Sequence, residues 1–418
     1  MNPAPTSGRP TLSRTAGYWI SAAVIGISLL SSCAPTALYD SYQAEWGFSP
    51  FVLTAVFATY GLSVLVALVA VGRVSDTIGR RPTMLASLAL LLVALVLFVA
   101  ADSVGWLFAA RALQGLSTGA AIGAAGAAML DLHPRGDMIR AGRLNGATST
   151  GSMGVGILVA AVLVEHGPWP LRLPFLVVIV LVVLVIVGVA LMPEPVEHRE
   201  RLRLRPAWPH VPREIRGAFV FSSLGVFASW SIGGLFLSLG PRLTAIELDT
   251  TDKVLASLGV VAVCLAGTVA QVLAGRFDPW RLMAGGSIVL TVGVAATIGA
   301  LSLGSGPVFV ATAAVIGVGW GTTYLGSLGA LTSVIPVAHR AAVMSAMFVV
   351  AYLSMSVPAL AAGVVATVWD VIPAFRLLGA VVIVVALGVA IAAPRMRPPR
   401  ATPVEEVSLA VEPAACVR

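Results

Sequence analysis

Blocks of about 20 apolar residues recur along nearly the whole chain, and this pattern constrains the fold more than any other feature. A helix of about 20 residues crosses the roughly 30 Å hydrocarbon core of a bilayer. Of 418 residues, 58% are hydrophobic and 11% are charged, whereas soluble domains carry about a quarter charged residues. A membrane barrel would instead show alternating segments of about 10 residues, which the sequence lacks. It therefore predicts an all-α polytopic membrane protein.

Twelve blocks are predicted to cross the membrane. Their limits are 17–39, 51–71, 83–101, 105–130, 144–164, 172–192, 217–239, 254–275, 282–303, 307–332, 341–367 and 371–393. An even number of spans places both termini on one side. Residues 193–216 are rich in Arg, Glu and Pro and divide the spans six and six. The predicted organisation is a cytosolic tail (1–16), a six-helix half (17–192), a cytosolic linker (193–216), a second half (217–393) and a disordered cytosolic tail (394–418).

Positive charge is concentrated in alternate connections. The net charge is +7, from 26 Lys and Arg residues against 19 Asp and Glu. Most of the basic residues lie in predicted cytosolic segments, which is the positive-inside pattern of membrane proteins. The charge therefore predicts a multi-pass protein of the cell membrane with both termini in the cytosol, and not a nucleic-acid-binding protein. The first apolar run lacks a convincing cleavage site, so we interpret it as a retained helix.

The sequence shows no pattern for metal or covalent chemistry. Cys33, Cys264 and Cys416 have neither metal-ligand nor disulfide spacing. No phosphate-binding loop or nucleophile constellation is present. We therefore expect no metal, no cofactor and no enzymatic activity.

A short basic loop follows the second span and reads Gly72-Arg-Val-Ser-Asp-Thr-Ile-Gly-Arg-Arg81. A shortened echo, Gly275-Arg-Phe-Asp-Pro-Trp-Arg281, follows the second span of the second half. The shared position indicates two parallel repeats. In transporters built this way, the substrate binds at the interface between the repeats.

Over residues 17–393, the chain resembles the major facilitator superfamily. The family's loop signature is matched by Gly72, Asp76, Gly79, Arg80 and Arg81, with Thr77 in place of the usual basic residue. Its fourth-span signature is matched by Arg111, Gln114 and Gly115. The resemblance implies twelve helices in two pseudo-symmetric six-helix halves around a central cavity.

The loop signature also predicts a cytosolic gate. The resemblance places Asp76 against the start of span 11, near Arg340. Asp131 lies at the cytosolic end of span 4 and is the best candidate partner for Arg80. Our hypothesis is that Asp76, Arg80 and Asp131 form a latch that stabilises the outward-open state, with Gly72, Gly79 and Arg81 shaping the loop. The alternative is a set of solvated loop charges.

Arg111 is a charged residue that lies six residues into the fourth span. An Arg at mid-membrane costs roughly 2.5–3.5 kcal/mol on insertion scales, so it usually faces a cavity or a partner. Gln114 follows on the same helix face. We therefore predict a cavity-lining Arg111 rather than one that reaches the outer interface. Asp40 lies at the external end of span 1. The alternatives are that it pairs with Arg111, that it takes a proton, or that it is an ordinary helix-end carboxylate in water.

Mid-span aromatic and polar residues complete the predicted substrate site. They are Tyr60, Asn145, Trp230, Trp320, Tyr324 and Tyr352. In the family, spans 1, 4, 7 and 10 line the cavity, so the resemblance places Trp230 and Trp320 there. The alternative for each residue is helix packing or interhelical hydrogen bonding.

These patterns predict a secondary transporter that moves a small organic solute by alternating access. The leading interpretation is proton-coupled efflux of drug-like or metabolite molecules, and the alternative is proton-coupled uptake of a small organic acid or sugar. A membrane enzyme or a sensor would need clustered acidic and histidine residues within the spans, or a large extramembrane domain. The expected partners are the solute, protons and the lipid bilayer, and the chain is expected to act as a monomer.

Overall fold

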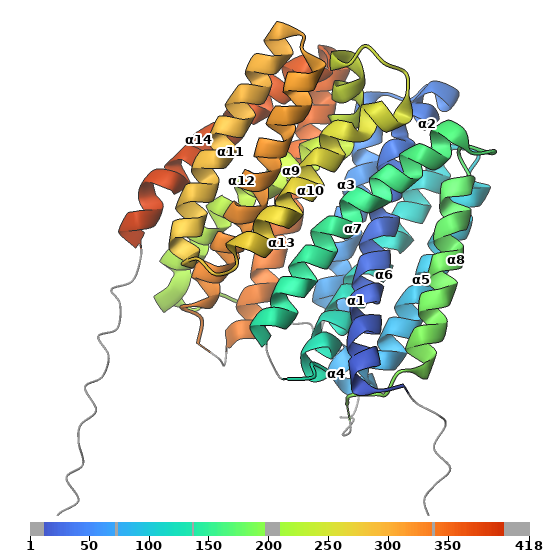
Figure 1. Cartoon of the computed structure of the whole chain (residues 1–418), viewed down its shortest axis with the longest axis vertical. Coiled ribbons are helices and arrows are strands. Elements are labelled where there is room, and N and C mark those ends of the chain that lie inside the picture. The colour runs from blue at the N-terminus through green and yellow to red at the C-terminus, as the bar shows by residue number, and fades with distance from the viewer. Residues whose placement is uncertain (1–11, 72–73, 136–137, 197–209, 337–338, 397–418) are drawn as a thin grey trace, which may run out of the picture.

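The computed structural model describes residues 12–71, 74–135, 138–196, 210–336 and 339–396 (Figure 1). Within these residues the chain is helical and contains no strand. Twelve of its helices are long and apolar enough to cross a membrane. The predicted all-α polytopic fold is therefore confirmed.

In chain order, with η marking a 3-10 helix, the elements are α1 (Arg14–Cys33), η1 (Ala34–Ala37), α2 (Tyr39–Trp46), α3 (Pro50–Val71), α4 (Val74–Ile78), α5 (Arg80–Ala100), α6 (Val104–Asp131), α7 (Met138–His166), α8 (Leu173–Leu191), η2 (Arg213–Ile215), α9 (Arg216–Glu247), α10 (Lys253–Ala274), α11 (Pro279–Leu303), α12 (Gly306–Thr332), α13 (Arg340–Val368) and α14 (Val371–Met396).

The first span is broken near its end, where the sequence predicted one helix to residue 39. α1 ends at Cys33, and the 3-10 helix η1 begins at Ala34. Pro35 has no N–H group, so it cannot donate the hydrogen bond to Ser31 that a continuous α-helix requires. The chain then turns into the short helix α2, which ends at Trp46 and is followed by Gly47 with a left-handed φ of 66°. This break determines where Tyr39 and Asp40 lie.

The helices form two halves. α1, α3 and α5 to α8 pack together in the first half, and α9 to α14 pack together in the second. The most extensive contacts between the halves are those of α7 with α10 and of α3 with α13. Figure 1 shows α7 running beside α10 between the two groups. A solute site between the halves must therefore lie among these four helices and their neighbours.

The two ends of the bundle differ in charge. The starts of α1 and α5 and the ends of α6, α10 and α14 lie at one end of the bundle, here called the basic face, together with both ends of the described chain (Figure 1). Arg14, Arg80, Arg135, Arg276 and Arg395 lie within or close to these helix ends. The other end, here called the opposite face, carries α2 and the loops 167–172 and 248–252.

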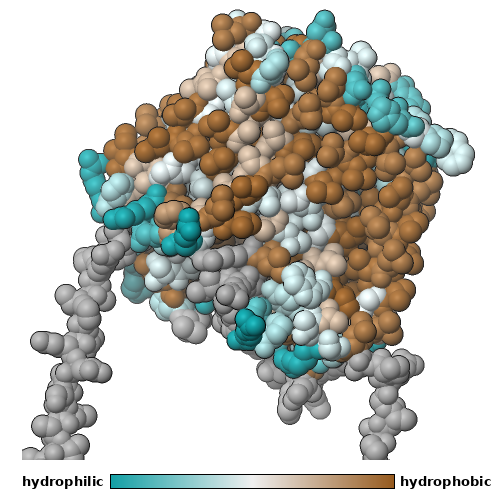
Figure 2. Space-filling model, viewed as in Figure 1, coloured by the Kyte–Doolittle hydropathy of each residue, from teal (hydrophilic) through white to brown (hydrophobic). Residues whose placement is uncertain are grey.

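Between these ends, the outer surface is largely hydrophobic (Figure 2). On α8, Leu184 is 62% exposed, and on α14, Val384 is 71% exposed. Such large apolar side chains on peripheral helices would be costly in water, so these surfaces face lipid. Polar residues are confined to the ends and to the interior.

The boundaries around the linker differ slightly from the prediction. α8 ends at Leu191, η2 and α9 begin at Arg213 and Arg216, and residues 197–209 lie outside the described part of the chain. α14 continues to Met396, past the predicted limit of 393. Ala393 is fully buried against a cluster that includes Trp280, and this packing holds the last turn.

Candidate solute site and its supporting contacts

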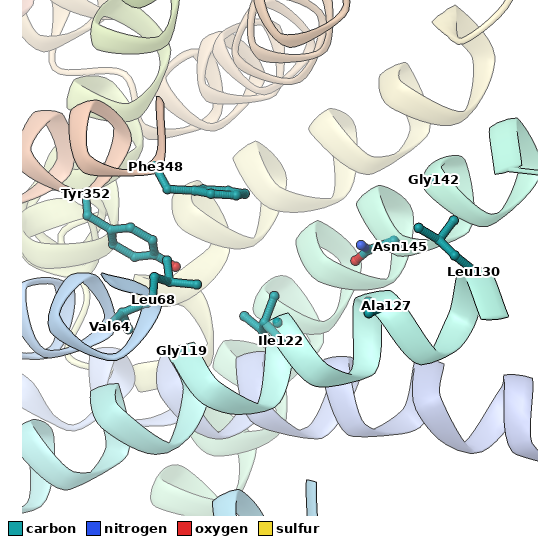
Figure 3. A pocket seen from close by; sticks show the side chains of 12 residues that line it. Val64, Leu68, Gly119, Ile122, Ala127, Leu130, Gly142, Asn145, Phe348 and Tyr352 are labelled. Atoms are coloured by element: carbon teal, nitrogen blue, oxygen red, sulfur yellow. The ribbon is translucent and has the colours of Figure 1, made fainter. Parts of the chain in front are cut away.

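A cavity of about 270 Å³ lies between the halves. Four helices contribute to it, namely α3, α6 and α7 of the first half and α13 of the second. Its lining residues are Val64, Leu68, Gly119, Ile122, Gly123, Gly126, Ala127, Leu130, Gly142, Asn145, Phe348 and Tyr352. Figure 3 shows Tyr352 and Phe348 projecting from α13 and Asn145 lying across the space from them. None of the lining residues is charged.

Glycines make room for this cavity. A Cβ added at Gly123 or Gly142 would have no atom within 4 Å, so both positions face open space. At Gly119, by contrast, an added Cβ would lie 2.7 Å from Ala67 Cβ and from the Val64 carbonyl. Close approach of α3 and α6 therefore needs glycine at 119, while a side chain at 123 or 142 would extend into open space without a clash.

The cavity lies toward the basic face. Leu130 is one residue from the end of α6, and Gly142 lies in the second turn of α7. Of the predicted site residues, only Asn145 and Tyr352 are among those that line the cavity. Sequence reasoning missed Phe348, although it lies four residues before Tyr352 and so on the same face of α13.

Contacts between the halves close the opposite face. The Phe51 amide donates to Thr367 Oγ1 at 3.0 Å, and Gly363 packs directly on Thr54. The Lys253 amide donates to the Glu165 carboxylate at 2.8 Å. The structure therefore has a cavity toward the basic face and joined halves at the other.

Arg111 is fully buried, with 0% exposure, in a network of neutral acceptors. Its Nη1 donates to the Ser32 carbonyl at 2.6 Å and to Gln114 Oε1 at 2.8 Å. Nε donates to Tyr39 Oη at 3.0 Å, and Nη2 donates to the same hydroxyl. The guanidinium also lies 5.4 Å from the ring centroids of Tyr39 and Tyr60. No carboxylate of the described chain forms an ion pair with it.

The end of α1 explains how a cation is held there without a carboxylate. Pro35 stops the helix, which leaves carbonyls at its C-terminus without helical partners. The Ser31 carbonyl accepts from Gln114 Nε2 at 3.0 Å, and the Ser32 carbonyl accepts from Arg111. A helix C-terminus carries partial negative charge, which favours a cation. The Arg-x-x-Gln pair of α6 therefore binds the broken end of α1.

The structure differs from two expectations for Arg111. It does not line the described cavity, and it does not pair with Asp40. Adjacent residues of a helix point about 100° apart, so Tyr39 turns toward Arg111 while Asp40 turns away. Asp40 is half-buried and faces the second half, where it shares a small space with Gln43 and Arg242. Arg242 Nη1 donates to Gln43 Oε1 at 3.2 Å, which is another contact between the halves.

Burial raises the pKa of the Asp40 carboxyl above its ordinary value. The positive charges of Lys253 and Arg242 lower this pKa but offset the burial only in part. Neither residue lies within ion-pair distance of Asp40 among the contacts of the described residues. Asp40 is therefore a carboxyl at the junction of the halves that accepts a proton more readily than one in water.

The predicted aromatic residues lie in two groups, one next to the cavity and one away from it. Trp230 of α9 lies 5.6 Å from Tyr324 and 5.2 Å from Tyr352, measured between ring centroids. This trio reaches the cavity through Tyr352. Trp320 instead packs near Gly233 and Gly267, and its buried Nε1 has no hydrogen-bond partner among the described residues. Tyr60 lies with Arg111. The expected placement of Trp320 in the cavity is therefore not what the structure has.

At the basic face, Arg80 Nε lies 3.2 Å from Asp131 Oδ2, and Arg80 Nη1 donates to Ser75 Oγ at 2.8 Å. These contacts join α5 to α6 and α4 within one half. The Arg80–Asp131 pair therefore cannot by itself hold the two halves together. Gly72 lies outside the described residues, as does the side chain of Asp76, so the proposed contact of Asp76 with α13 stays a prediction.

Glu194 is a residue of this region that sequence reasoning missed. Its carboxylate accepts from the Arg80 amide at 2.9 Å and from the Arg81 amide at 3.0 Å, so it caps the start of α5. Gly79 has a φ of 108°, and a Cβ there would lie 2.7 Å from Glu194 Oε2. Arg81 donates to the Ala190 carbonyl. In the sequence, Glu194 lies between two prolines just after the sixth span, and this position was the only feature that could have indicated its role.

Comparison with known proteins agrees with this architecture. Residues 19–359 match the family model of the Major Facilitator Superfamily. A stretch of 112 residues is 35% identical to Multidrug resistance protein D of Escherichia coli (strain K12), covering 27% of this chain and 25% of that protein. The chain is therefore aligned with only a quarter of that relative. Since the family model spans most of the chain, including both halves of the bundle, this multi-pass membrane protein belongs to the Major Facilitator Superfamily of secondary transporters.

Proposed function

We propose that this protein exports a small, neutral or apolar organic solute by alternating access, driven by proton antiport. The cavity of about 270 Å³ between the halves carries the proposal. Its walls are aliphatic and aromatic, with Asn145 and the Tyr352 hydroxyl as polar groups. A cavity without charged residues gives an ionic solute no compensation for its lost hydration.

We propose that the described conformation is the one that takes up a solute from the cytosol for export. With the basic face in the cytosol, as the positive-inside pattern favours, the cavity opens toward cytosolic solutes while the opposite face is closed. Export then requires the contacts at Phe51, Gln43 and Glu165 to separate while the halves meet at the basic face. Asp76 against the start of α13 is our proposed contact for that second state.

Asp40 is our proposed proton site. It lies where the halves meet at the opposite face, and its pKa is raised in this closed state. Separation of the halves would hydrate the carboxyl and lower its pKa, so a proton that binds from outside favours closure of this face. Antiport then requires this proton to leave to the cytosol before the face reopens with solute. Proton binding is thus coupled to closure of this face through Arg242 and Lys253, and not through Arg111.

The partial relative supports export of drug-like molecules only weakly, because the alignment covers 25% of its length. The alternative is proton-coupled uptake of a small organic acid or sugar. The described cavity has no cationic side chain for an organic acid, and Arg111 is bound by neutral acceptors elsewhere. We further propose that the chain acts as a monomer in the cell membrane, with both termini in the cytosol.

Everted membrane vesicles with an acidic interior test this proposal. Addition of neutral aromatic amphiphiles should discharge the pH gradient in vesicles that contain the protein, while organic acids should not. Phe348→Ala should raise the half-saturating solute concentration about tenfold, since it removes an aromatic wall of the cavity. Phe277→Ala is the matched control, because Phe277 is 56% exposed at the basic face. Solute-driven acidification, or equal effects of the two variants, would contradict the proposal.

A further inference from the structure

A second cavity, of about 240 Å³, lies at the opposite face and belongs to the first half alone. It is formed by α2, the end of α5 and the loop between α7 and α8. No residue of the second half lines it, so it is separate from the solute cavity. We refer to it as the α2 slot, defined by Tyr42, Glu45, Trp46, Phe98, Trp169 and Arg172.

Aromatic rings form the walls of the α2 slot. Tyr42 and Trp46 are stacked, with ring centroids 4.8 Å apart and planes at 23°. Phe98, at the base, is stacked on Phe175 at 4.6 Å. The Tyr42 hydroxyl donates to the Leu171 carbonyl at 3.5 Å, which ties α2 to the loop. The walls are therefore held in place from two sides.

Trp169 is held at the rim in an unusual conformation. Its φ is 55°, and its side chain is 68% exposed. A bulky residue in the left-handed region is strained, and such strain persists where the surroundings impose it. The Trp169 carbonyl accepts from the Arg172 and Leu173 amides, both at 2.9 Å, which fixes the turn. The turn thus presents a large apolar ring away from the protein.

Two opposite charges lie on the same slot. Glu45 comes from α2, and Arg172 immediately precedes α8. Both side chains are exposed, and within the described residues neither has a hydrogen bond or an ion pair. A ligand that carries both an ammonium group and a phosphate would match this pair of charges.

The slot also lies at the edge of the lipid-facing surface. α5 and α8 begin or end there and expose Val96 and Val180 further along, at 54% and 59%. Tryptophan is enriched at this depth because its ring suits the headgroup region.

We propose that the α2 slot binds the headgroup of a zwitterionic phospholipid with a primary ammonium, of the phosphatidylethanolamine type, from the leaflet at the opposite face. Glu45 accepts the ammonium hydrogens, Arg172 binds the phosphate, and Trp46 and Trp169 pack on the glycerol region. This inference does not depend on the solute or on the direction of transport.

The test is native mass spectrometry of the full-length protein, released from micelles that contain equal amounts of phosphatidylethanolamine, phosphatidylcholine and phosphatidylglycerol. The protein should retain phosphatidylethanolamine in preference to the other two. Glu45→Gln and Arg172→Gln should each lower its retention about tenfold, since each removes one charge-assisted contact. The fold-reduction in retention for the double variant should be smaller than the product of the two single fold-reductions, because both contacts hold the same lipid.

Glu214→Gln and Arg213→Gln are matched controls, because both residues are exposed at the basic face. Glu45 and Arg172 are exposed and unbonded, so their replacement leaves no buried group unpaired. Trp169→Gly keeps the left-handed turn, removes the ring and should also lower retention. Unchanged retention in all three slot variants would overturn the proposal, as would a preference for phosphatidylglycerol or phosphatidylcholine.

Discussion

Replacement of Arg111 tests whether its shape or its charge holds the first half together. Arg111→Lys keeps a buried cation, and Arg111→Met removes it at similar volume. The guanidinium reaches Tyr39, Ser32 and Gln114 from three nitrogens. A lysine ammonium carries its charge and its donors on one nitrogen, so it cannot reproduce the planar arrangement of donors in the guanidinium. Comparison of the two variants therefore distinguishes two contributions to the free energy of unfolding, that of the hydrogen bonds and that of burying a charge.

The expected magnitudes follow from the contacts. Lysine should lose about two of the charge-assisted bonds, at roughly 1.5–3 kcal/mol each, while it retains the full cost of a buried charge. Arg111→Lys should thus lower the free energy of unfolding by about 3 kcal/mol or more. Methionine leaves three buried acceptors unpaired, at roughly 1–3 kcal/mol each, but recovers several kcal/mol of desolvation. Arg111→Met should therefore be no more destabilising than Arg111→Lys.

Denaturation of the purified protein in mixed micelles would measure both free energies. A second readout is the reaction of buried Cys33 with a maleimide, in a chain that lacks Cys264 and Cys416, because Cys33 is next to Ser32. Labelling should be faster in Arg111→Lys. Arg281→Lys is the control, since Arg281 is exposed. If the free energy of unfolding of Arg111→Lys were within about 0.5 kcal/mol of the parent value, a positive charge alone would be enough to stabilise this site. That result would refute the role we assign to the planar guanidinium.

Three further predictions use the contacts between and within the halves. The raised pKa of Asp40 means that its protonation stabilises this conformation at low pH, and that this stability is lost as pH rises through the raised pKa. Asp40→Asn should therefore flatten the dependence of the unfolding midpoint on pH above about 4. Gly61→Leu should force α3 away from Ser356, since even a Cβ at Gly61 would lie 2.6 Å from its Oγ; labelling of an engineered cysteine at the opposite face should increase. Glu194→Gln should cost about 1–2 kcal/mol of unfolding free energy, because it weakens two bonds to the amides at the start of α5.

The number of helices and their halves could be predicted because a bilayer leaves few choices. Backbone groups in hydrocarbon must be paired within the segment, so each long apolar block becomes one helix. The same reasoning indicated a partner for Arg111, since an isolated cation in a span is costly. It correctly placed Gln114 beside Arg111, because residues three apart share a helix face.

The identity of the remaining partners could not be predicted, because it depends on a single break in the first span. With a continuous helix to residue 39, Asp40 is a reasonable partner for Arg111. With the break at Pro35, the carbonyls of Ser31 and Ser32 become available, and Tyr39 rather than Asp40 turns inward. A shift of one residue thus exchanged a carboxylate for a hydroxyl. A proline in the sequence predicts where a helix breaks, but it does not predict the direction of the chain after the break.

The two contacts between the halves differ in extent, and this difference places the entrance of the cavity. α7 and α10 remain joined far toward the basic face, where Gln271 Nε2 donates to Thr150 Oγ1 at 3.2 Å. On the other side, a Cβ at Gly61 of α3 would lie 2.8 Å from Met355 Cε of α13, yet Val64 and Tyr352, one turn further toward the basic face, line the cavity. The separation of the halves therefore begins just past Gly61. We therefore propose that a solute from the basic face enters between α3 and α13, where Phe348 is the aromatic residue nearest the start of α13 in the cavity wall.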